Sequence, residues 1–216
     1  MSAILDLTIA VIAKECLPGK VKTRLSPPLS PREAARLAQL SLSQTLETVR
    51  HLPVRERWLV MDGTPSASDA KDFVVLPQAS GGLDERLAAV CDAVTGPLLI
   101  VGMDTPQFSS DHLAAVFRDW ATENRQHEAW FGPAADGGFW ALALANPRAA
   151  LIRGVRMSTD TTGEEQLARL TSAGLSVGML PELRDMDFLH DAVHIAAEIP
   201  GSAFAGVVTG LRNTLP

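Results

Sequence analysis

The sequence predicts a single α/β domain with a mainly parallel sheet covered by helices on both faces. Short apolar strands alternate with helical segments along the 216 residues, which is the order of elements found in such sheets. Two strands, residues 7–13 and 97–102, are apolar nearly throughout, as expected of strands that are buried on both faces. No linker or change in composition divides the chain, whose length suffices for one sizeable core.

The other elements are predicted from their periodicity and their boundary residues. A helix begins after Ser30, because Ser30 and Glu33 fit a capping box around a proline at the first helical position, and its apolar spacing continues to about Val49. Further strands are expected at residues 57–61, 73–76, 128–132, 139–144 and 175–180. Further helices are expected at residues 83–94, from Ser109 or Ser110 towards Trp120, and at 163–172.

The predicted domain spans residues 1–199 and is followed by a tail, residues 200–216. This tail is Gly-rich and moderately apolar, so it could pack either on the body of the domain or on a partner. A homodimer is one such arrangement, and the sequence does not fix the oligomeric state.

Charge and apolar pattern exclude several classes of protein. A formal net charge of −6 and a pI near 5.3 argue against nucleic acid or an anionic membrane as the main partner, since both require broad basic faces. The longest apolar stretches fall far short of the ~20 residues of a membrane-spanning helix, and the N-terminus has no signal-like segment. Two cysteines form neither a disulfide framework nor a metal quartet. We therefore expect a cytoplasmic protein with a small-molecule substrate.

A basic loop directly after the first predicted strand is the clearest candidate site. It contains three of the four lysines of the chain and one arginine: Lys14, Lys20, Lys22 and Arg24. Lysine supplies point charges, Arg24 supplies a fork that matches phosphate oxygens, and Gly19 allows a turn whose N–H groups can face an anion. The loop lacks the glycine pattern of a Walker A or dinucleotide-binding motif. A solvated basic turn is the alternative interpretation.

Two acidic loops follow other predicted strands. Asp104 comes immediately after the strand at 97–102 and could offer a hard oxygen to Mg2+, with phosphates and water completing the octahedron. It could instead cap the following helix. Asp136 lies in the sequence Asp-Gly-Gly between two strands, where it could accept a hydrogen bond from a hydroxyl; a hairpin turn is the simpler explanation of Asp136, Gly137 and Gly138.

Two further segments complete the set of candidates. Asp185 and Asp187 stand beside Arg184, and one of them could be the second protein ligand of a metal held by Asp104; a surface ion pair is an equal alternative. Gly82 opens the helix predicted at 83–94, in a loop suited to a flat base or an anion. His190 has the spacing of a helical zinc pair with a second histidine four residues later, but no third ligand is evident, so it is interpreted as solvated or capping.

Five motifs in this order resemble one bacterial family. They are Lys14-x3-Pro-Gly-Lys-Val-Lys22-Thr-Arg24-Leu, Gly82-Leu-x-Glu-Arg86, Gly102-x-Asp104-x-Pro106, Gly132-Pro-Ala-x-Asp136-Gly137-Gly138 and Arg184-Asp185-x-Asp187. Together they look like a family of glycosyltransferase-A-like proteins of the nucleotide-diphospho-sugar transferase superfamily, related to the molybdopterin and phospholactate guanylyltransferases. The chain departs from the pattern of that family after Asp187, where Phe188-Leu-His190 replaces the usual Thr-Pro-Glu.

The resemblance implies a Rossmann-like glycosyltransferase-A fold and a set of roles. Lys14, Lys22 and Arg24, with the turn at Gly19, would hold the phosphates of a nucleotide, and the loop around Gly82 would lie near its base. Asp104 with Asp187 would hold Mg2+ or Mn2+, and Asp136, Gly137 and Gly138 would meet the acceptor.

The expected activity is metal-dependent nucleotidyl transfer to a small, phosphorylated acceptor with release of pyrophosphate, in which Lys22, Arg24, Asp104 and Asp136 act on the reacting groups. Glycosyl transfer from a nucleotide-diphospho-sugar is an alternative within the fold. A third hypothesis is a non-catalytic nucleotide-binding regulator.

Overall fold

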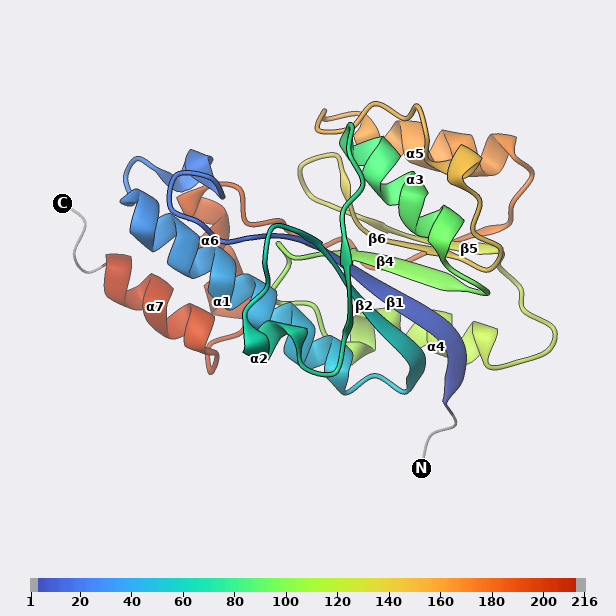
Figure 1. The fold of residues 1–216 in the computed structure, drawn as a ribbon, viewed down its shortest axis with the longest axis horizontal. Coiled ribbons are helices and arrows are strands. Elements are labelled where there is room, and N and C mark those ends of the chain that lie inside the picture. The colour runs from blue at the N-terminus through green and yellow to red at the C-terminus, as the bar shows by residue number, and fades with distance from the viewer. Residues whose placement is uncertain (1–3, 213–216) are drawn as a thin grey trace.

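The sheet at the centre of this computed structural model, which describes residues 4–212, has seven strands within those residues (Figure 1). The strands are β1 (Leu5–Lys14), β2 (Val54–Asp62), β3 (Val74–Pro77), β4 (Leu98–Gly102), β5 (Ala129–Pro133), β6 (Phe139–Leu144) and β7 (Val177–Met179). The helices are α1 (Pro31–Arg50), α2 (Ala67–Ala70), α3 (Leu83–Ala93), α4 (Ala114–Trp120), α5 (Thr162–Ser172), α6 (Leu189–Glu198) and α7 (Ala203–Arg212). Three short 3-10 helices are η1 (Thr23–Leu25), η2 (Ser110–Leu113) and η3 (Ala149–Leu151).

The strand order is β3-β2-β1-β4-β6-β5-β7, with β1 near the middle. β1 pairs in parallel with β2 and β4, whereas β6 runs antiparallel to both of its neighbours, β4 and β5. The remaining pairs, β2 with β3 and β5 with β7, are also parallel. The predicted mainly parallel α/β sheet is confirmed, and β5 and β6 form the antiparallel hairpin that the Asp-Gly turn favours.

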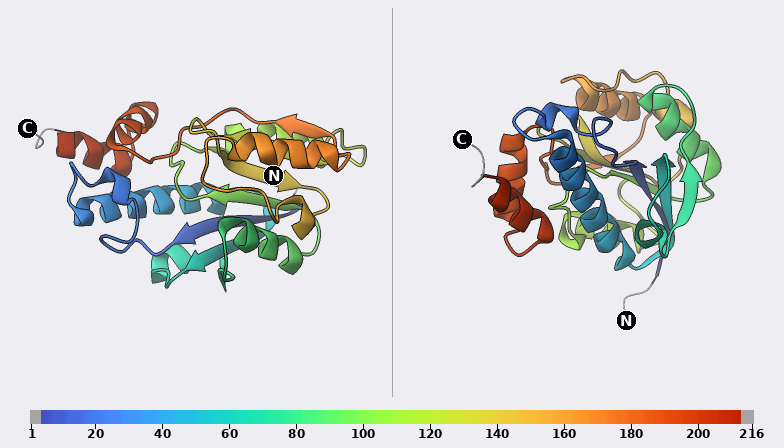
Figure 2. Two further views of the ribbon diagram at one scale, coloured as in Figure 1. Left: turned by 90° about the horizontal axis from the view of Figure 1, so that it is seen from above. Right: turned by 60° about the vertical axis from the view of Figure 1, so that its left-hand side comes forward.

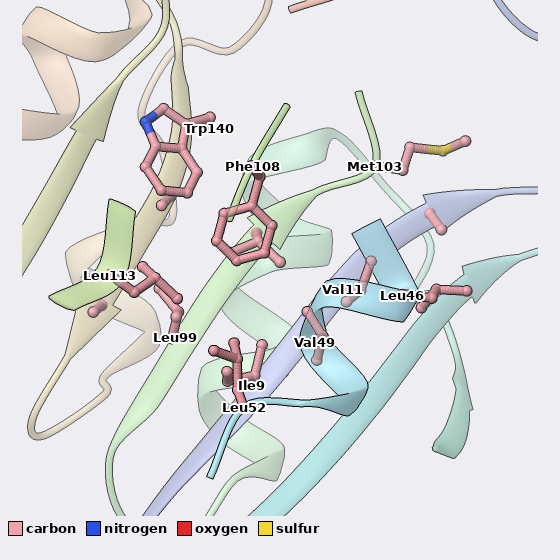
Figure 3. Close-up of a cluster of buried hydrophobic side chains, with 14 of the residues drawn as sticks. Ile9, Val11, Leu46, Val49, Leu52, Leu99, Met103, Phe108, Leu113 and Trp140 are labelled. Atoms are coloured by element: carbon pink, nitrogen blue, oxygen red, sulfur yellow. The ribbon is translucent and has the colours of Figure 1, made fainter. Parts of the chain in front are cut away.

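Side-chain alternation along β1 divides the core into two layers. Leu7, Ile9 and Val11 face α1 and α4, and they belong to the cluster drawn in Figure 3 with residues such as Leu46 and Leu99. The alternating residues of β1 pack with α3 and α5 on the opposite face. Figures 1 and 2 show these two pairs of helices on opposite sides of the sheet. Burial on both faces explains why this strand has no polar side in the sequence.

Element boundaries follow the predicted signals closely. The capping box of α1 is present: the Ser30 hydroxyl accepts from the Glu33 N–H at 3.3 Å, and the Glu33 carboxylate accepts from the Ser30 N–H at 2.7 Å. The helix predicted from Ser109 towards Trp120 is divided into η2 and α4. The helices α2, α6 and α7 were not predicted from the sequence.

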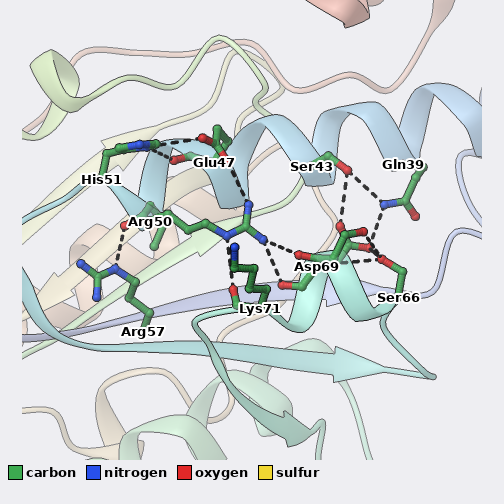
Figure 4. A network of polar contacts seen from close by, with 11 residues as sticks. Gln39, Ser43, Glu47, Arg50, His51, Arg57, Ser66, Asp69 and Lys71 are labelled. Atoms are coloured by element: carbon green, nitrogen blue, oxygen red, sulfur yellow. Dashed lines mark hydrogen bonds and ion pairs between the residues drawn. The ribbon is translucent and has the colours of Figure 1, made fainter.

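A buried carboxylate fixes α2 against α1 (Figure 4). Asp69 is 3% exposed and accepts hydrogen bonds from Gln39 at 2.9 Å, from Ser43 at 3.4 Å and from Ser66 at 2.6 Å. Arg50 donates to the carbonyl oxygen of Lys71 at 3.2 Å, just after α2. These bonds satisfy an acceptor that would otherwise be costly to bury, and they define the path from β2 to β3.

The predicted tail is described through residue 212, and residues 213–216 lie outside the described part. Its helix α7 packs on α6 and α1. The sequence left open whether the tail packs on the body of the domain or on a partner, and in the structure residues 203–212 pack on the body. A third apolar cluster joins η1, α1, α6 and α7 through residues including Leu25, Leu37, Ile195 and Phe204. Figure 2 shows α6 and α7 beside the N-terminal part of α1, at one end of the molecule. Among the described residues, no helix combines the length and apolar character needed to cross a membrane.

Candidate functional site

A cleft of about 840 Å3 opens where the parallel strands end. Lys14 at the end of β1, Asp62 at the end of β2 and Gly102 at the end of β4 all line it. This is the edge at which open α/β sheets bind ligands, because the loops that follow the strands meet there. Six of the predicted site residues line the cleft: Lys14, Arg24, Asp104, Asp136, Gly138 and Asp187.

The ammonium group of Lys22 lies between two predicted metal ligands. Its Nζ is 2.8 Å from Asp104 Oδ2 and 2.9 Å from Asp187 Oδ1, and its side chain is only 9% exposed. Burial alone would lower the pKa of Lys22, but the two carboxylates outweigh it and raise the pKa above its ordinary value. In this structure Lys22 neutralises the acidic residues; its role as a phosphate ligand remains a prediction.

Local backbone geometry sets this position of Lys22. Its φ of 47° and ψ of 45° are left-handed, a conformation that costs a residue with a Cβ roughly 1–2 kcal/mol. Val21 and Leu25 on either side are buried, which anchors the chain around it. The two ion pairs offset the backbone cost.

Arg24 extends the same ion-pair network towards solvent. Its Nη1 donates to Asp187 Oδ2 at 2.8 Å, so both oxygens of Asp187 are paired with cations. Burial alone would raise the pKa of Asp187, but Lys22 and Arg24 hold it below its ordinary value. Arg24 remains 64% exposed, and the Lys14 ammonium has no hydrogen-bond or ion-pair partner within residues 4–212, so both cations are available to an anion in the cleft.

Two carboxylate oxygens in the cleft lack any partner among the described residues. Asp104 Oδ1 and Asp185 Oδ1 are both buried without a hydrogen bond. The two loops are joined directly, because the Met186 N–H donates to the Asp104 carbonyl at 3.0 Å. Burial, followed by repulsion from Asp136 and Asp104, raises the pKa of Asp185 to about 7. Such oxygens fit a hard cation, and this donor set matches Mg2+, which typically takes one or two protein carboxylates and completes its shell with phosphates and water.

Within residues 4–212, no three His, Cys, Asp or Glu side chains form a ready-made metal cage. The sequence left open whether Asp185 or Asp187 is the partner of Asp104. In this structure Asp185 has the free oxygen, whereas the oxygens of Asp187 are engaged.

The turn between β5 and β6 is both a hairpin and part of the cleft. Asp136 Oδ1 accepts from the Gly138 N–H at 2.8 Å, which closes the turn and leaves Asp136 exposed at the cleft. Gly137 has a φ of +89°, and a Cβ there would lie 2.0 Å from the Asp160 carbonyl oxygen. Gly137 therefore does not face the cleft as predicted; it allows residues 158–160 to pack against the turn and line the cleft beside Asp136.

Polar residues that the sequence analysis left without a role form the end of the cleft near α3. Arg86 donates to Asp62 at 3.2 Å and to Gln78 at 3.1 Å, and Gln78 donates to the Ala13 carbonyl at 2.7 Å. These bonds join the ends of β1 and β2 to the first turns of α3. Arg86 was part of a recognised motif, whereas Asp62 and Gln78 could have been found only from their position after strands.

The two predicted glycines of the nucleotide site do not line the cleft. Gly82 is the exposed N-cap residue of α3, and Gly19 lies in an exposed turn with a φ of +73°. Their roles in binding remain predictions that rest on loop position.

Residues before and at the start of α6 form an aromatic and cationic rim of the cleft, together with Arg24. Phe188 is 45% exposed and stacks on His190 with ring centroids 5.6 Å apart and planes 9° apart. The Arg24 guanidinium lies 5.9 Å from the centroid of the Phe188 ring. Phe188, His190 and Arg184 all line the cleft. The departure from the family pattern at Phe188 and His190 was noted from the sequence, but no role in the cleft was predicted for these residues.

Comparison with known sequences identifies a family profile. The profile of the family described as "Uncharacterized protein conserved in bacteria (DUF2064)" matches residues 45–159, more than half of the chain. The matched stretch includes Asp104 and the Asp136 turn. No curated protein matches the chain.

Solved structures have the same fold at low sequence identity. A candidate nucleotide-diphospho-sugar transferase from Desulfovibrio desulfuricans G20 has a TM-score of 0.81 at 19% identity over 94% of each chain. A cytidylyltransferase from Leptospira borgpetersenii has a TM-score of 0.56 at 12% identity, covering 97% of this chain and 94% of that one. CMP:2-keto-3-deoxy-manno-octonic acid synthetase, solved with CTP, has a TM-score of 0.53 at 12% identity, covering 90% and 98%. These likenesses confirm the predicted nucleotide-diphospho-sugar transferase fold.

Proposed function

We propose that this chain, which belongs to the bacterial DUF2064 family, is a metal-dependent nucleotidyltransferase that acts on a small acceptor. The observation that carries the proposal is the juxtaposition, in one cleft, of cations that keep unused donors with buried carboxylate oxygens that have no partner among the described residues. Lys14 and Arg24 supply the cations, and Asp104 and Asp185 supply the oxygens. A nucleoside triphosphate with its metal ion carries the complementary charges.

The nucleotide base is assigned to the end of the cleft near α3. Leu83 offers an exposed apolar side chain there, and Arg86 and Asp62 offer a donor and an acceptor. The phosphates would then point towards the basic loop and Asp104. The CTP complex of a protein with this fold agrees with a nucleotide as ligand, and we extend that ligand class to this chain as part of the proposal.

Asp104 and Asp185 are the residues that would hold Mg2+ or Mn2+. When bound, such an ion would neutralise phosphate charge and orient the phosphates. Asp187 could join them once Lys22 and Arg24 turn from its oxygens to the phosphates. Lys22 thus has two alternative partners of the same charge, the carboxylates in the free protein and the phosphates in the complex.

In the proposed reaction an acceptor oxygen attacks the α phosphorus in line. The bond between the α phosphorus and its bridging oxygen breaks, and pyrophosphate leaves with the electron pair. Lys14, Lys22 and Arg24 would stabilise the charge that develops on the phosphates. Asp136, on its rigid turn, would accept a hydrogen bond from the attacking hydroxyl and take its proton as the new bond to phosphorus forms. Catalysis would come from positioning and charge neutralisation.

Pyrophosphate release tests this proposal. The protein is incubated with each nucleoside triphosphate, Mg2+ and a panel of small phosphorylated acceptors, and pyrophosphate is measured. We expect release with one base preferred and a loss of about 100-fold or more in Asp104→Asn, in line with removal of one key electrostatic group. Arg118→Gln, a substitution on α4 outside the cleft lining, is the control. Unchanged metal-dependent nucleotide binding in Asp104→Asn would contradict the metal assignment.

Glycosyl transfer is the second candidate, favoured by the likeness to the Desulfovibrio protein. The same cleft would then hold a nucleotide-diphospho-sugar, and the bond between the sugar and the diphosphate would break. Turnover only with nucleotide sugars would replace the first proposal by this one. Nucleotide binding without turnover of either substrate would identify a regulator.

A further inference from the structure

The rim cluster, which we define as Arg24, Arg184, Phe188 and His190, has unused binding capacity. Arg24 uses Nη1 for Asp187, and Arg184 uses Nη1 for Asp191 at 3.1 Å. Among the described residues, the other two nitrogens of each guanidinium group have no hydrogen-bond partner, although all four rim residues line the cleft. Both guanidinium groups line the same cleft with free donors, and guanidinium groups are typical ligands of a phosphate or carboxylate.

A buried aspartate holds the rim cluster in place. Asp191 is 6% exposed; its Oδ2 accepts from the Phe188 N–H at 2.8 Å, while its Oδ1 accepts from Arg184 and lies 3.3 Å from His190 Nε2. One carboxylate thus orients three of the four rim residues. A cluster organised by a buried charge is a built feature of the fold and differs in this respect from scattered surface arginines.

The rim cluster is separate from the groups assigned to the nucleotide base. Leu83 and Arg86 belong to α3, which packs in the second core cluster. The rim comes from η1, the segment before α6 and the start of α6, and both η1 and α6 pack in the third cluster. Asp104 and Asp185, which would hold the metal ion and the reacting phosphates, line the same cleft. A ligand on the rim would contact elements other than those assigned to the base.

We propose that the rim cluster is the acceptor subsite and that it takes a phosphate monoester carried on a planar or apolar group. The free donors of Arg184 would bind the phosphate dianion, and Arg24 would be shared between it and the nucleotide phosphates. The 45% exposed ring of Phe188 would pack on the apolar part. The name acceptor subsite rests on the proposed function. The binding of a phosphate monoester by the rim cluster does not depend on it. It adds Arg184, Phe188 and His190 to Asp136 and Gly138, the predicted acceptor residues that line the cleft.

Calorimetric titration with phenyl phosphate tests the subsite, because this probe joins a dianion to a flat ring. We expect saturable binding by the wild-type protein and binding at least about tenfold weaker for inorganic phosphate or phenol, each of which lacks one of the two interactions. Benzoate is expected to bind more weakly as well, since a monoanion cannot use two guanidinium groups as fully. Equally tight benzoate binding would overturn the assignment of a phosphate monoester.

Three variants separate a local role from a structural one. Phe188→Ala and Arg184→Gln should each weaken phenyl phosphate binding about tenfold, whereas Arg156→Gln, which removes an exposed guanidinium outside the cleft, should leave it unchanged. Thermal unfolding is recorded for each variant; if Arg184→Gln unfolds, His190→Gln takes its place. Equal binding by the wild type, Phe188→Ala and the folded rim variant overturns the proposal, as does no binding by the wild type.

Nucleotide binding by the same samples distinguishes this inference from the proposed function. Phenyl phosphate binding that depends on the rim, in a protein that binds no nucleotide, would retain the subsite and refute nucleotidyl transfer. Nucleotide binding with Mg2+ and no rim-dependent binding of phenyl phosphate would refute the subsite and retain the proposed function.

Discussion

Lys22→Met is expected to destabilise the folded protein by about 2 kcal/mol. The substitution leaves Asp104 and Asp187 without the ammonium group that lies 2.8 and 2.9 Å from their oxygens. Removing one partner of a fully buried ion pair costs about 3–5 kcal/mol. Here the carboxylates keep 33% and 27% side-chain exposure and Arg24 still pairs with Asp187, so water and Arg24 offset part of the loss. For a domain of this size, the expected fall in Tm is about 4–8 °C.

This contribution should be constant through the neutral pH range. The pKa of Lys22 is raised above its ordinary value of 10.5, so its stabilisation is complete below pH 10.5 and is lost as the pH rises through the higher folded value. The pKa of Asp187 is lowered from 3.8, so its share is complete above pH 3.8 and is lost as the pH falls through the lower folded value.

Urea denaturation at neutral pH in the presence of EDTA measures the effect, with Lys20→Met as the matched control. Lys20 is exposed, and its ammonium has no ion pair within residues 4–212, so its substitution should change the free energy of unfolding by less than about 0.5 kcal/mol. If Lys22→Met and Lys20→Met have the same stability, Lys22 does not bridge the two carboxylates in solution. The interpretation of Lys22 as the charge that balances the acidic residues would then be wrong.

Three other substitutions test the framework of the site. Gly137→Ala should destabilise the protein by about 1–3 kcal/mol and displace residues 158–160 from the turn, because its Cβ would lie 2.0 Å from the Asp160 carbonyl oxygen. Thermal unfolding measures the loss. Gly206→Ala, which has open space around its Cβ, is the control. Asp119→Asn should cost about 1.5–3 kcal/mol of unfolding free energy at neutral pH, since Asp119 accepts from the N–H groups of Gln126 and His127 and from Trp130. Burial alone would raise the pKa of Asp119, but these bonds outweigh it and lower the pKa. The stabilisation by Asp119 is therefore complete above pH 3.8, and urea titrations should show its loss as the pH falls through the folded value. Phe204→Ala should cost about 3–5 kcal/mol of unfolding free energy, because Phe204 is 1% exposed in the third core cluster; exposed Thr209→Ala on the same helix should have little effect, and equal Tm values for the two would refute that packing.

The order of elements and the location of the cleft could be predicted because local signals decide them. The capping residues Ser30 and Glu33 fixed the start of α1, and continuous apolar runs identified β1 and β4. Once the strands are parallel, the loops after them must meet at one edge, which is why Lys14 and Asp104 were expected in one site.

The pairing inside the site could not be predicted, since it depends on contacts across 80 or more residues of sequence. Lys22 was expected to face phosphate, but its left-handed backbone directs the ammonium group to Asp104 and Asp187. The distinction between Asp185 and Asp187 likewise depends on which oxygens other side chains occupy. Spacing alone carries no such information.

The C-terminal helices link the stability of the fold to the geometry of the cleft. Residues of η1, α1, α6 and α7 share one apolar cluster, in which Leu25 and Phe204 are almost fully buried. η1 carries Arg24, and α6 begins beside Phe188, so the wall that faces the aspartates is held from behind by this cluster. Because η1 and α6 rest on this cluster, loosening α7 should disturb Arg24 and Phe188 before it disturbs the end of the cleft near α3. The segment predicted as a tail therefore helps to position one side of the candidate site.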